Sequence, residues 1–190
     1  MITWQVKQTI CGIRDLEHQR GSQITHLLSI LDPDAPDPTL YFGMAPEEYL
    51  TVRFHDVILP HPDLVLPQRE HIEQVLAFGR KLPQGDPAHL LIHCHMGISR
   101  STAAAAAILL QAHPDLSEDA ALDEIQRIRP TAWPNSLMIL HADALLGREG
   151  RLLAALGRLY RRQLEANPRF ADPLRTGGRL AEVEMAEAAG

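Results

Sequence analysis

The chain has 190 residues, of which 45% are hydrophobic and 22% are charged, a composition typical of one folded domain of ordinary size. Its formal net charge of −6 argues against a nucleic-acid-binding protein, because phosphate backbones are bound by basic surfaces. The longest strongly apolar run, residues 102–112, is too short to span a bilayer, and residues 1–7 lack the apolar core of a signal peptide. We therefore expect a cytoplasmic protein with no membrane and no nucleic-acid partner.

Apolar segments and loop-forming segments alternate along most of the chain. Short apolar runs closed by proline-rich stretches predict strands, and apolar residues at helical spacing predict helices. In chain order we expect a strand at 23–31, a loop at 32–38, a strand at 50–54, a loop at 56–67, a helix at 68–81, a strand at 89–93, and helices at 99–113, 117–127, 134–146 and 147–164. Strands that alternate with helices predict an α/β fold, with a small and mostly parallel central sheet flanked by helices and a helical C-terminal extension.

The domain organisation follows from the same pattern. We expect a single domain over residues 1–166 and a loosely ordered tail over residues 167–190, because Pro168, Pro173 and two adjacent glycines interrupt the tail. The apolar stripe within 145–164 predicts packing onto the domain, with a dimer interface as the alternative. The chain is accordingly expected to be a monomer or a homodimer.

Only two cysteines are present, Cys11 and Cys94, too few for a disulfide framework. Cys94 follows the strand predicted at 89–93. In parallel sheets ligands bind beyond the carboxyl ends of the strands, so Cys94 lies where a site is expected. Cys11 has no such context, and we interpret it as structural, the alternative being a redox partner that protects Cys94.

The segment from residue 93 to residue 101 combines several features of an anion-binding loop. It reads His93-Cys94-His95-Met96-Gly97-Ile98-Ser99-Arg100-Ser101. Backbone N–H groups of a tight loop that enters a helix form a nest for an anion, and the same field stabilises a thiolate at Cys94. Gly97 permits a positive φ, and Arg100 offers two parallel N–H donors to phosphate oxygens. Ser101 is placed to hydrogen-bond the thiolate. Together these residues predict a phosphate cradle with a nucleophile at its base.

This segment resembles the signature of the cysteine-dependent protein tyrosine phosphatases, close to the small dual-specificity branch and its compact bacterial members. Two further segments carry the resemblance, a strand followed by an aspartate at 52–56 and an Arg…Pro-Asn segment at 127–135, so that it spans about residues 23–146. The resemblance implies a phosphomonoester hydrolase in which Cys94 forms a cysteinyl-phosphate and an aspartic acid protonates the leaving oxygen. It implies no metal and no organic cofactor.

The identity of that aspartic acid stays open between two residues. Asp56 follows a strand-like run, as in the family, and it is our choice. Asp63 is nearer to Cys94 and matches the more usual sequence separation. The proline-rich loop between them varies in length in such folds.

The remaining site residues are assigned around the loop. The residues expected to bind the substrate phosphate are His95, Met96, Gly97, Ile98, Ser99 and Arg100. His93 and Asn135 are expected to support the loop, Asn135 first of all as a helix cap. A metal site built on 93–95 is disfavoured, because adjacent residues of a strand point to opposite faces.

Three residues outside the loop each allow two structural interpretations. Trp133 is either a core residue or part of the pocket wall. Arg127 and Arg129 are read as a solvated face, the alternative being that one of them holds a second anion or the loop at 134–135.

The expected substrate is a phosphorylated protein of the phosphotyrosine type or a small aryl phosphate, with dual specificity open. Phosphoinositide-selective relatives tend to carry lysines within the loop, and residues 95–99 contain none. Two alternatives from other classes are a phosphate-binding module without turnover and a sulfur transferase of the rhodanese kind.

Overall fold

The computed structural model describes residues 5–36, 45–83 and 86–189, and within them the sheet has four strands. They are β1 (Val6–Gly12), β2 (His26–Leu31), β3 (Glu48–Arg53) and β4 (Ala88–Cys94). Their order is β1-β4-β2-β3, and every neighbouring pair is parallel. The predicted α/β fold is confirmed, although residues 37 and 38 of the loop expected at 32–38 lie outside the described residues.

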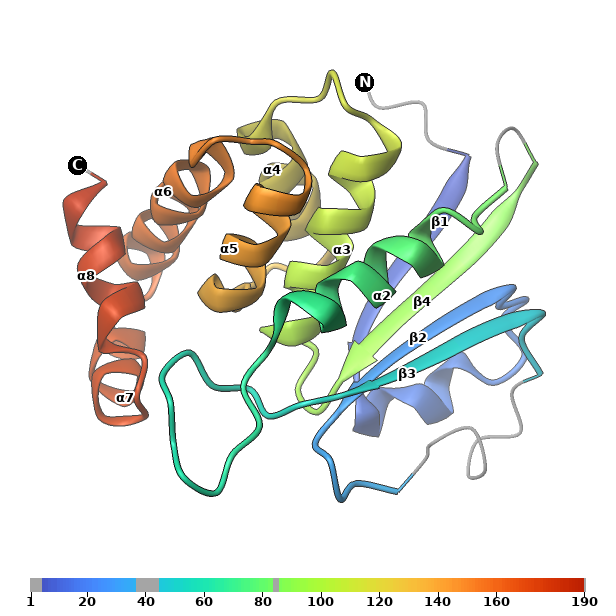
Figure 1. Cartoon of the computed structure of the whole chain (residues 1–190), viewed down its shortest axis with the longest axis horizontal. Helices are drawn as coiled ribbons and strands as arrows, with labels where there is room; N and C mark the ends of the chain where they lie inside the picture. The colour runs from blue at the N-terminus through green and yellow to red at the C-terminus, as the bar shows by residue number, and fades with distance from the viewer. Residues whose placement is uncertain (1–4, 37–44, 84–85, 190) are drawn as a thin grey trace.

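Most helices gather beside one face of this sheet, and η1 lies against the other (Figure 1). The helical elements are η1 (Ile13–Gln19), α2 (Arg69–Gly79), α3 (Arg100–Ala112), α4 (Glu118–Ile128), α5 (Ser136–Leu145), α6 (Arg151–Ala166), η2 (Pro168–Phe170), α7 (Ala171–Thr176) and α8 (Leu180–Ala188). The helix expected from residue 147 begins only at Arg151, because Gly147 and Gly150 adopt positive φ angles of 63° and 84°. Within the described ranges, none of these helices is both long and apolar enough to cross a membrane.

Strand β1 is the sheet element that the sequence pattern does not predict. It contains polar residues at Lys7, Gln8 and Thr9, so no continuous apolar run marks it. It is an edge strand that pairs with β4 alone. Such a strand can carry polar residues, and here Lys7 is exposed while Gln8 and Thr9 are half-buried. Its register places Gly12 directly beside Cys94, so the end of β1 adjoins the predicted phosphate loop.

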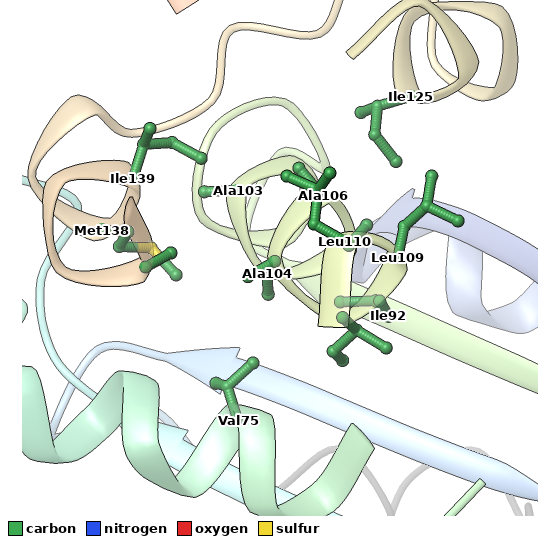
Figure 2. Packing of buried hydrophobic residues seen from close by; sticks show 14 of the residues in the cluster. Val75, Ile92, Ala103, Ala104, Ala106, Leu109, Leu110, Ile125, Met138 and Ile139 are labelled. Carbon is green, nitrogen blue, oxygen red and sulfur yellow. The ribbon is translucent and has the colours of Figure 1, made fainter. Parts of the chain in front are cut away.

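The core is built around α3, which runs between the sheet and the other helices (Figure 2). Its five consecutive alanines, residues 103–107, are buried, and their small side chains allow the helix to lie close to the sheet. Successive side chains of β4 point to opposite faces of the sheet, and both faces are buried. Leu90 and Ile92 pack in the main core, whereas Leu91 packs with Leu16 of η1 on the other face. Cys94 continues the first of these two rows.

The C-terminal segment differs from the loosely ordered tail expected from residue 167. It forms η2, α7 and α8, and Val183 of α8 is fully buried. The prolines do not prevent this, because Pro168 and Pro173 lie in first turns, where the missing N–H has no intrahelical partner. Gly178, with a φ of 79°, reverses the chain before α8, which lies beside α6 (Figure 1).

Helix α6 uses its apolar stripe inside the chain, with Leu152, Leu156 and Leu159 buried. Two arginines of α6 also tie it to α4: Arg158 and Arg162 form ion pairs with aspartates of α4 at 2.6 and 2.7 Å. The stripe therefore packs onto the domain. The choice between monomer and homodimer stays a prediction.

The centre of the sheet is expected to be sensitive to loss of volume. Ile92→Ala removes three carbons from a fully buried side chain, and we expect the free energy of unfolding to fall by about 2–5 kcal/mol. Leu140→Ala on α5 is the control, because that side chain is 47% exposed and should change stability by less than about 0.5 kcal/mol. Urea unfolding measures both, and equal effects would contradict the assigned core.

Candidate active site

The loop from Cys94 to Arg100 joins the end of β4 to the first turn of α3. The Sγ atom of Cys94 accepts a hydrogen bond from the N–H of Gly97 at 3.3 Å, and it shares a second one with the hydroxyl of Ser101, whose Oγ also lies at 3.3 Å. Cys94 is only 2% exposed. Cys94 thus lies at the base of the loop with its sulfur bonded to the loop itself, a position that suits a nucleophile.

The carbonyl groups of the loop point away from its centre. Each meets a donor from a different element: the N–H of Ile13 bonds the oxygen of His95 at 3.0 Å, Nη2 of Arg129 bonds that of Met96 at 2.9 Å, and the N–H of Trp133 bonds that of Ile98 at 2.9 Å. Thr102 Oγ1 bonds the oxygen of Ser99 at 2.8 Å. With these oxygens held outward, the N–H groups of the loop are left to face its centre, as in an anion nest.

Gly97 makes this arrangement possible. Its φ is 70°, a conformation that side chains rarely adopt, and a Cβ there would lie 2.3 Å from the backbone carbon of Cys11. The end of β1 therefore presses directly on the loop and leaves no room for a side chain at this position.

Arg100 is 2% exposed and anchored by one of its nitrogens. Its Nη1 donates to Oδ1 of Asp32 and to the carbonyl of Phe54, each at 2.6 Å, at the ends of β2 and β3. Its Nε is buried and has no hydrogen-bond partner among the described residues. The bonds of Nη1 thus fix the side chain, and the guanidinium keeps other N–H donors, including that of Nε, for an anion.

Asp56 lies against the loop through one carboxylate oxygen. Its Oδ1 accepts hydrogen bonds from Ser99 Oγ at 2.8 Å, from Asn135 Nδ2 at 2.9 Å and from Arg179 Nη2 at 2.5 Å. Burial raises the pKa of this carboxyl, but the positive charges of Arg179 and Arg100, with the two side-chain hydrogen bonds, outweigh it and hold the pKa below its usual value.

Asp63 is placed differently. Its side chain is exposed, and within the described parts of the chain no hydrogen bond or ion pair joins it to the loop. The structure brings Asp56, and not Asp63, into contact with the residues of the loop.

The other predicted residues surround this centre. His93 lies beneath the loop, where its Nε2 pairs with Ser29 Oγ at 2.7 Å. His95 and Met96 are exposed at the mouth of the loop, and Met96 is 64% exposed. Asn135 caps α5 as predicted, since its Oδ1 accepts from the N–H of Met138 at 3.0 Å.

Neighbouring residues resolve several alternatives left open by the sequence. Trp133 is buried and stacks on Tyr160 with ring centroids 4.1 Å apart, so it is a core residue. Arg127 pairs with Glu124 on the surface, as first interpreted, whereas Arg129 bonds the carbonyl of Met96 and so holds the 94–100 loop, a role that neither interpretation gave it. For Cys11, burial and the nearby Asp15 raise the pKa to about 12, as expected for an unreactive structural thiol.

Two residues of the site were missed by the sequence analysis. Asp32 ends the apolar run of β2, and the rule that carboxyl ends of parallel strands meet could have found it. Arg179 is 123 residues from Asp56 and lies in the segment expected to be loosely ordered. No spacing or motif in the sequence marks it.

Comparisons with known proteins show which folds this chain is similar to. No family model matches the chain. Human dual specificity protein phosphatase 12 is 27% identical over 125 residues, which cover 65% of this chain and 34% of that protein. The chain thus spans about a third of that relative's length. Among solved structures, human DUSP28 has a TM-score of 0.53 at 23% identity, covering 74% of this chain and 94% of that one. The phosphatase PTP-2 of Cydia pomonella has a TM-score of 0.55 at 16% identity, covering 73% and 84%.

These similarities confirm the resemblance drawn from the sequence. The chain has the fold of the cysteine-dependent protein tyrosine phosphatases and carries their Cys-to-Arg signature at 94–100.

The role of Gly97 can be tested by substitution. Gly97→Ala forces a left-handed alanine, costing about 1–2 kcal/mol, and also clashes with Cys11, so the unfolding free energy should fall by more than that and phosphate binding should be lost. Gly147→Ala is the matched control, since its φ is 63° but nothing lies within 4 Å of its Cβ. Denaturant unfolding and titration calorimetry with inorganic phosphate measure both effects. Equal stability and binding in the two variants would show that the contact with β1 is unimportant.

Proposed function

We propose that the protein is a phosphomonoester hydrolase of the protein tyrosine phosphatase type, acting through a cysteinyl-phosphate on Cys94. The observation that supports this best is the convergence of three groups on one loop: a thiol hydrogen-bonded to Gly97 and Ser101, an arginine with unused donors, and a carboxylate bonded to the loop itself. The proposed substrates are phosphorylated proteins of the phosphotyrosine type or small aryl phosphates. The proposed location is the cytoplasm, where both thiols stay reduced.

The first step transfers the phosphoryl group to sulfur. The thiolate of Cys94 attacks phosphorus, the bond from phosphorus to the leaving oxygen breaks, and Asp56 in its acid form gives that oxygen a proton. The N–H groups of the loop and Arg100 stabilise the charge on the three phosphoryl oxygens.

The second step restores the enzyme. Asp56, now a carboxylate, takes a proton from a water molecule that attacks phosphorus, and the bond between sulfur and phosphorus breaks. Inorganic phosphate leaves, and Ser101 donates a hydrogen bond to the departing thiolate. The depressed pKa of Asp56 favours its base form in this step and makes its acid form scarce at neutral pH, so we expect an acidic optimum.

The nucleophile can be tested with para-nitrophenyl phosphate. Cys94→Ser should reduce hydrolysis to the level of buffer while phosphate binding persists, because the loop and Arg100 are retained. Cys11→Ser is the control and should keep the parent's rate, since Cys11 is buried and unreactive. Hydrolysis by Cys94→Ser at the parent's rate would refute the thiol mechanism. Phosphate binding without turnover in the parent would favour a binding module, and thiosulfate:cyanide turnover would favour a sulfur transferase.

The choice of general acid can be tested by a pair of variants. Asp56→Asn should lower turnover by about 10²–10⁴-fold and remove the basic limb of the pH–rate profile, because no proton is delivered to the leaving oxygen. Asp63→Asn should leave both unchanged, since Asp63 is exposed and makes no hydrogen bond to the loop among the described residues. The reverse result would assign the role to Asp63.

A further inference from the structure

We propose that Arg179, in the C-terminal segment, is a positioning residue that orients the carboxyl group of Asp56 for proton transfer. This inference rests on the proposed function, in which Asp56 is the general acid. It makes α8 part of the catalytic unit, although the sequence places it in a tail outside the domain.

The contacts of Arg179 are concentrated on Asp56. Arg179 is the residue that precedes α8, and its side chain is 11% exposed. Its Nη2 donates to Oδ1 of Asp56 at 2.5 Å and to the backbone carbonyl of the same residue at 2.9 Å, and it lies 3.2 Å from Ser99 Oγ. The guanidinium thus holds both the main chain and the side chain of Asp56.

Arg179 is itself held by a buried acid. Its Nη1 donates to Oε1 of Glu182 at 3.0 Å, and Glu182 has no exposed surface. Glu182 also accepts from Nε1 of Trp133 at 2.6 Å and from the N–H of Ser136 at 2.9 Å. The backbone N–H of Trp133 bonds the phosphate loop at Ile98. The start of α8 is therefore tied to the loop by a continuous path of hydrogen bonds.

The arrangement leaves one oxygen of Asp56 for chemistry. Oδ1 receives the three donors from Ser99, Asn135 and Arg179, whereas Oδ2 makes no hydrogen bond within the described part of the chain. A carboxyl group whose Oδ1 is saturated with donors carries its proton on Oδ2. Arg179 contributes the only charged one of these three donors, so it has the largest influence on the orientation of the group.

Three charged or titratable groups of the described residues interact with Asp56: Arg179 before α8, Arg100 of α3 and Tyr160 of α6. Glu182 of α8 faces Arg179 and Tyr160. Arg100 makes its direct bonds elsewhere, to Asp32 and Phe54, so Arg179 is the cation bonded to the carboxylate. Loss of Arg179 should therefore raise the pKa of Asp56, keep its acid form to higher pH and move the basic limb of the rate profile upward.

The test is Arg179→Met in the full chain, with Arg175→Met as the matched control. Arg175 lies in the same segment, is 41% exposed, and pairs with Glu187 and Asp172 without contacting Asp56. For Arg179→Met we expect kcat at its own pH optimum to fall by about tenfold or more, and the basic limb of kcat/KM to move to higher pH. The loss should be greater with phenyl phosphate than with para-nitrophenyl phosphate, because the poorer leaving group needs the proton more.

Two further variants separate positioning from a structural role. Arg179→Lys keeps the charge without the planar pair of donors, so its basic limb should stay near the parent's while kcat falls. In an Asp56→Asn background, Arg179→Met should cause little further loss, because it acts through Asp56. Thermal unfolding identifies any variant that does not fold. If Arg179→Met does not fold, Arg179→Lys and the double variant built with it carry the test.

The outcomes distinguish this inference from the proposed function. Three results would overturn the role of Arg179 while leaving the proposed phosphatase activity in place. They are an unchanged basic limb of kcat/KM in Arg179→Met, an equal loss of kcat in Arg175→Met, and full additivity of Arg179→Met with Asp56→Asn. If Arg179→Met does not fold, an unchanged kcat in Arg179→Lys overturns the role. Parent activity that survives Cys94→Ser would instead overturn the proposed function.

Discussion

The outward orientation of the loop carbonyls is the constraint on which the rest of the site depends. Backbone N–H groups can surround an anion only if the paired C=O groups find donors elsewhere, since buried unpaired carbonyls are costly. Here those donors come from Ile13, Arg129 and Trp133, which belong to distant parts of the chain, and from Thr102 in the first turn of α3. The contact of Gly97 with the end of β1 completes the same arrangement. A phosphate-sized nest therefore requires the whole domain to be folded around it.

An acidic protein can hold phosphate in this way because the charge that matters is local. The net charge of −6 argues against an extended basic surface, yet one buried arginine and a ring of amide dipoles act in a region of low dielectric. The acidic partners Asp32 and Glu182 fix the two arginines without filling their donor capacity. Buried charges are thus paired, and each arginine keeps a defined geometry.

The sequence predicted much of the fold and the centre of the site. Apolar runs marked the inner strands β2 and β4, which are buried along their whole length, and a shorter run marked the edge strand β3, while proline and glycine marked the loops between them. Strand β1 was not predicted, because its polar residues interrupt the apolar pattern, which an edge strand tolerates. The tail at 167–190 was read from its prolines, whereas in the structure they occupy first turns of packed helices. The structural similarity to human DUSP28 covers 74% of this chain and agrees with the predicted α/β fold.

By itself, the sequence determined the local chemistry: a thiol, a glycine, an arginine and a serine at short spacing between a strand and a helix. These residues are neighbours in the chain, so their proximity needs no knowledge of the fold. The tertiary structure alone decided which distant groups join them. Asp56 rather than Asp63 contacts the loop, and Arg179 reaches Asp56 across 123 residues, because the packing of α8 on α6 brings them together. Such contacts leave no periodic or spacing signal in a single sequence, since they depend on how complete elements pack.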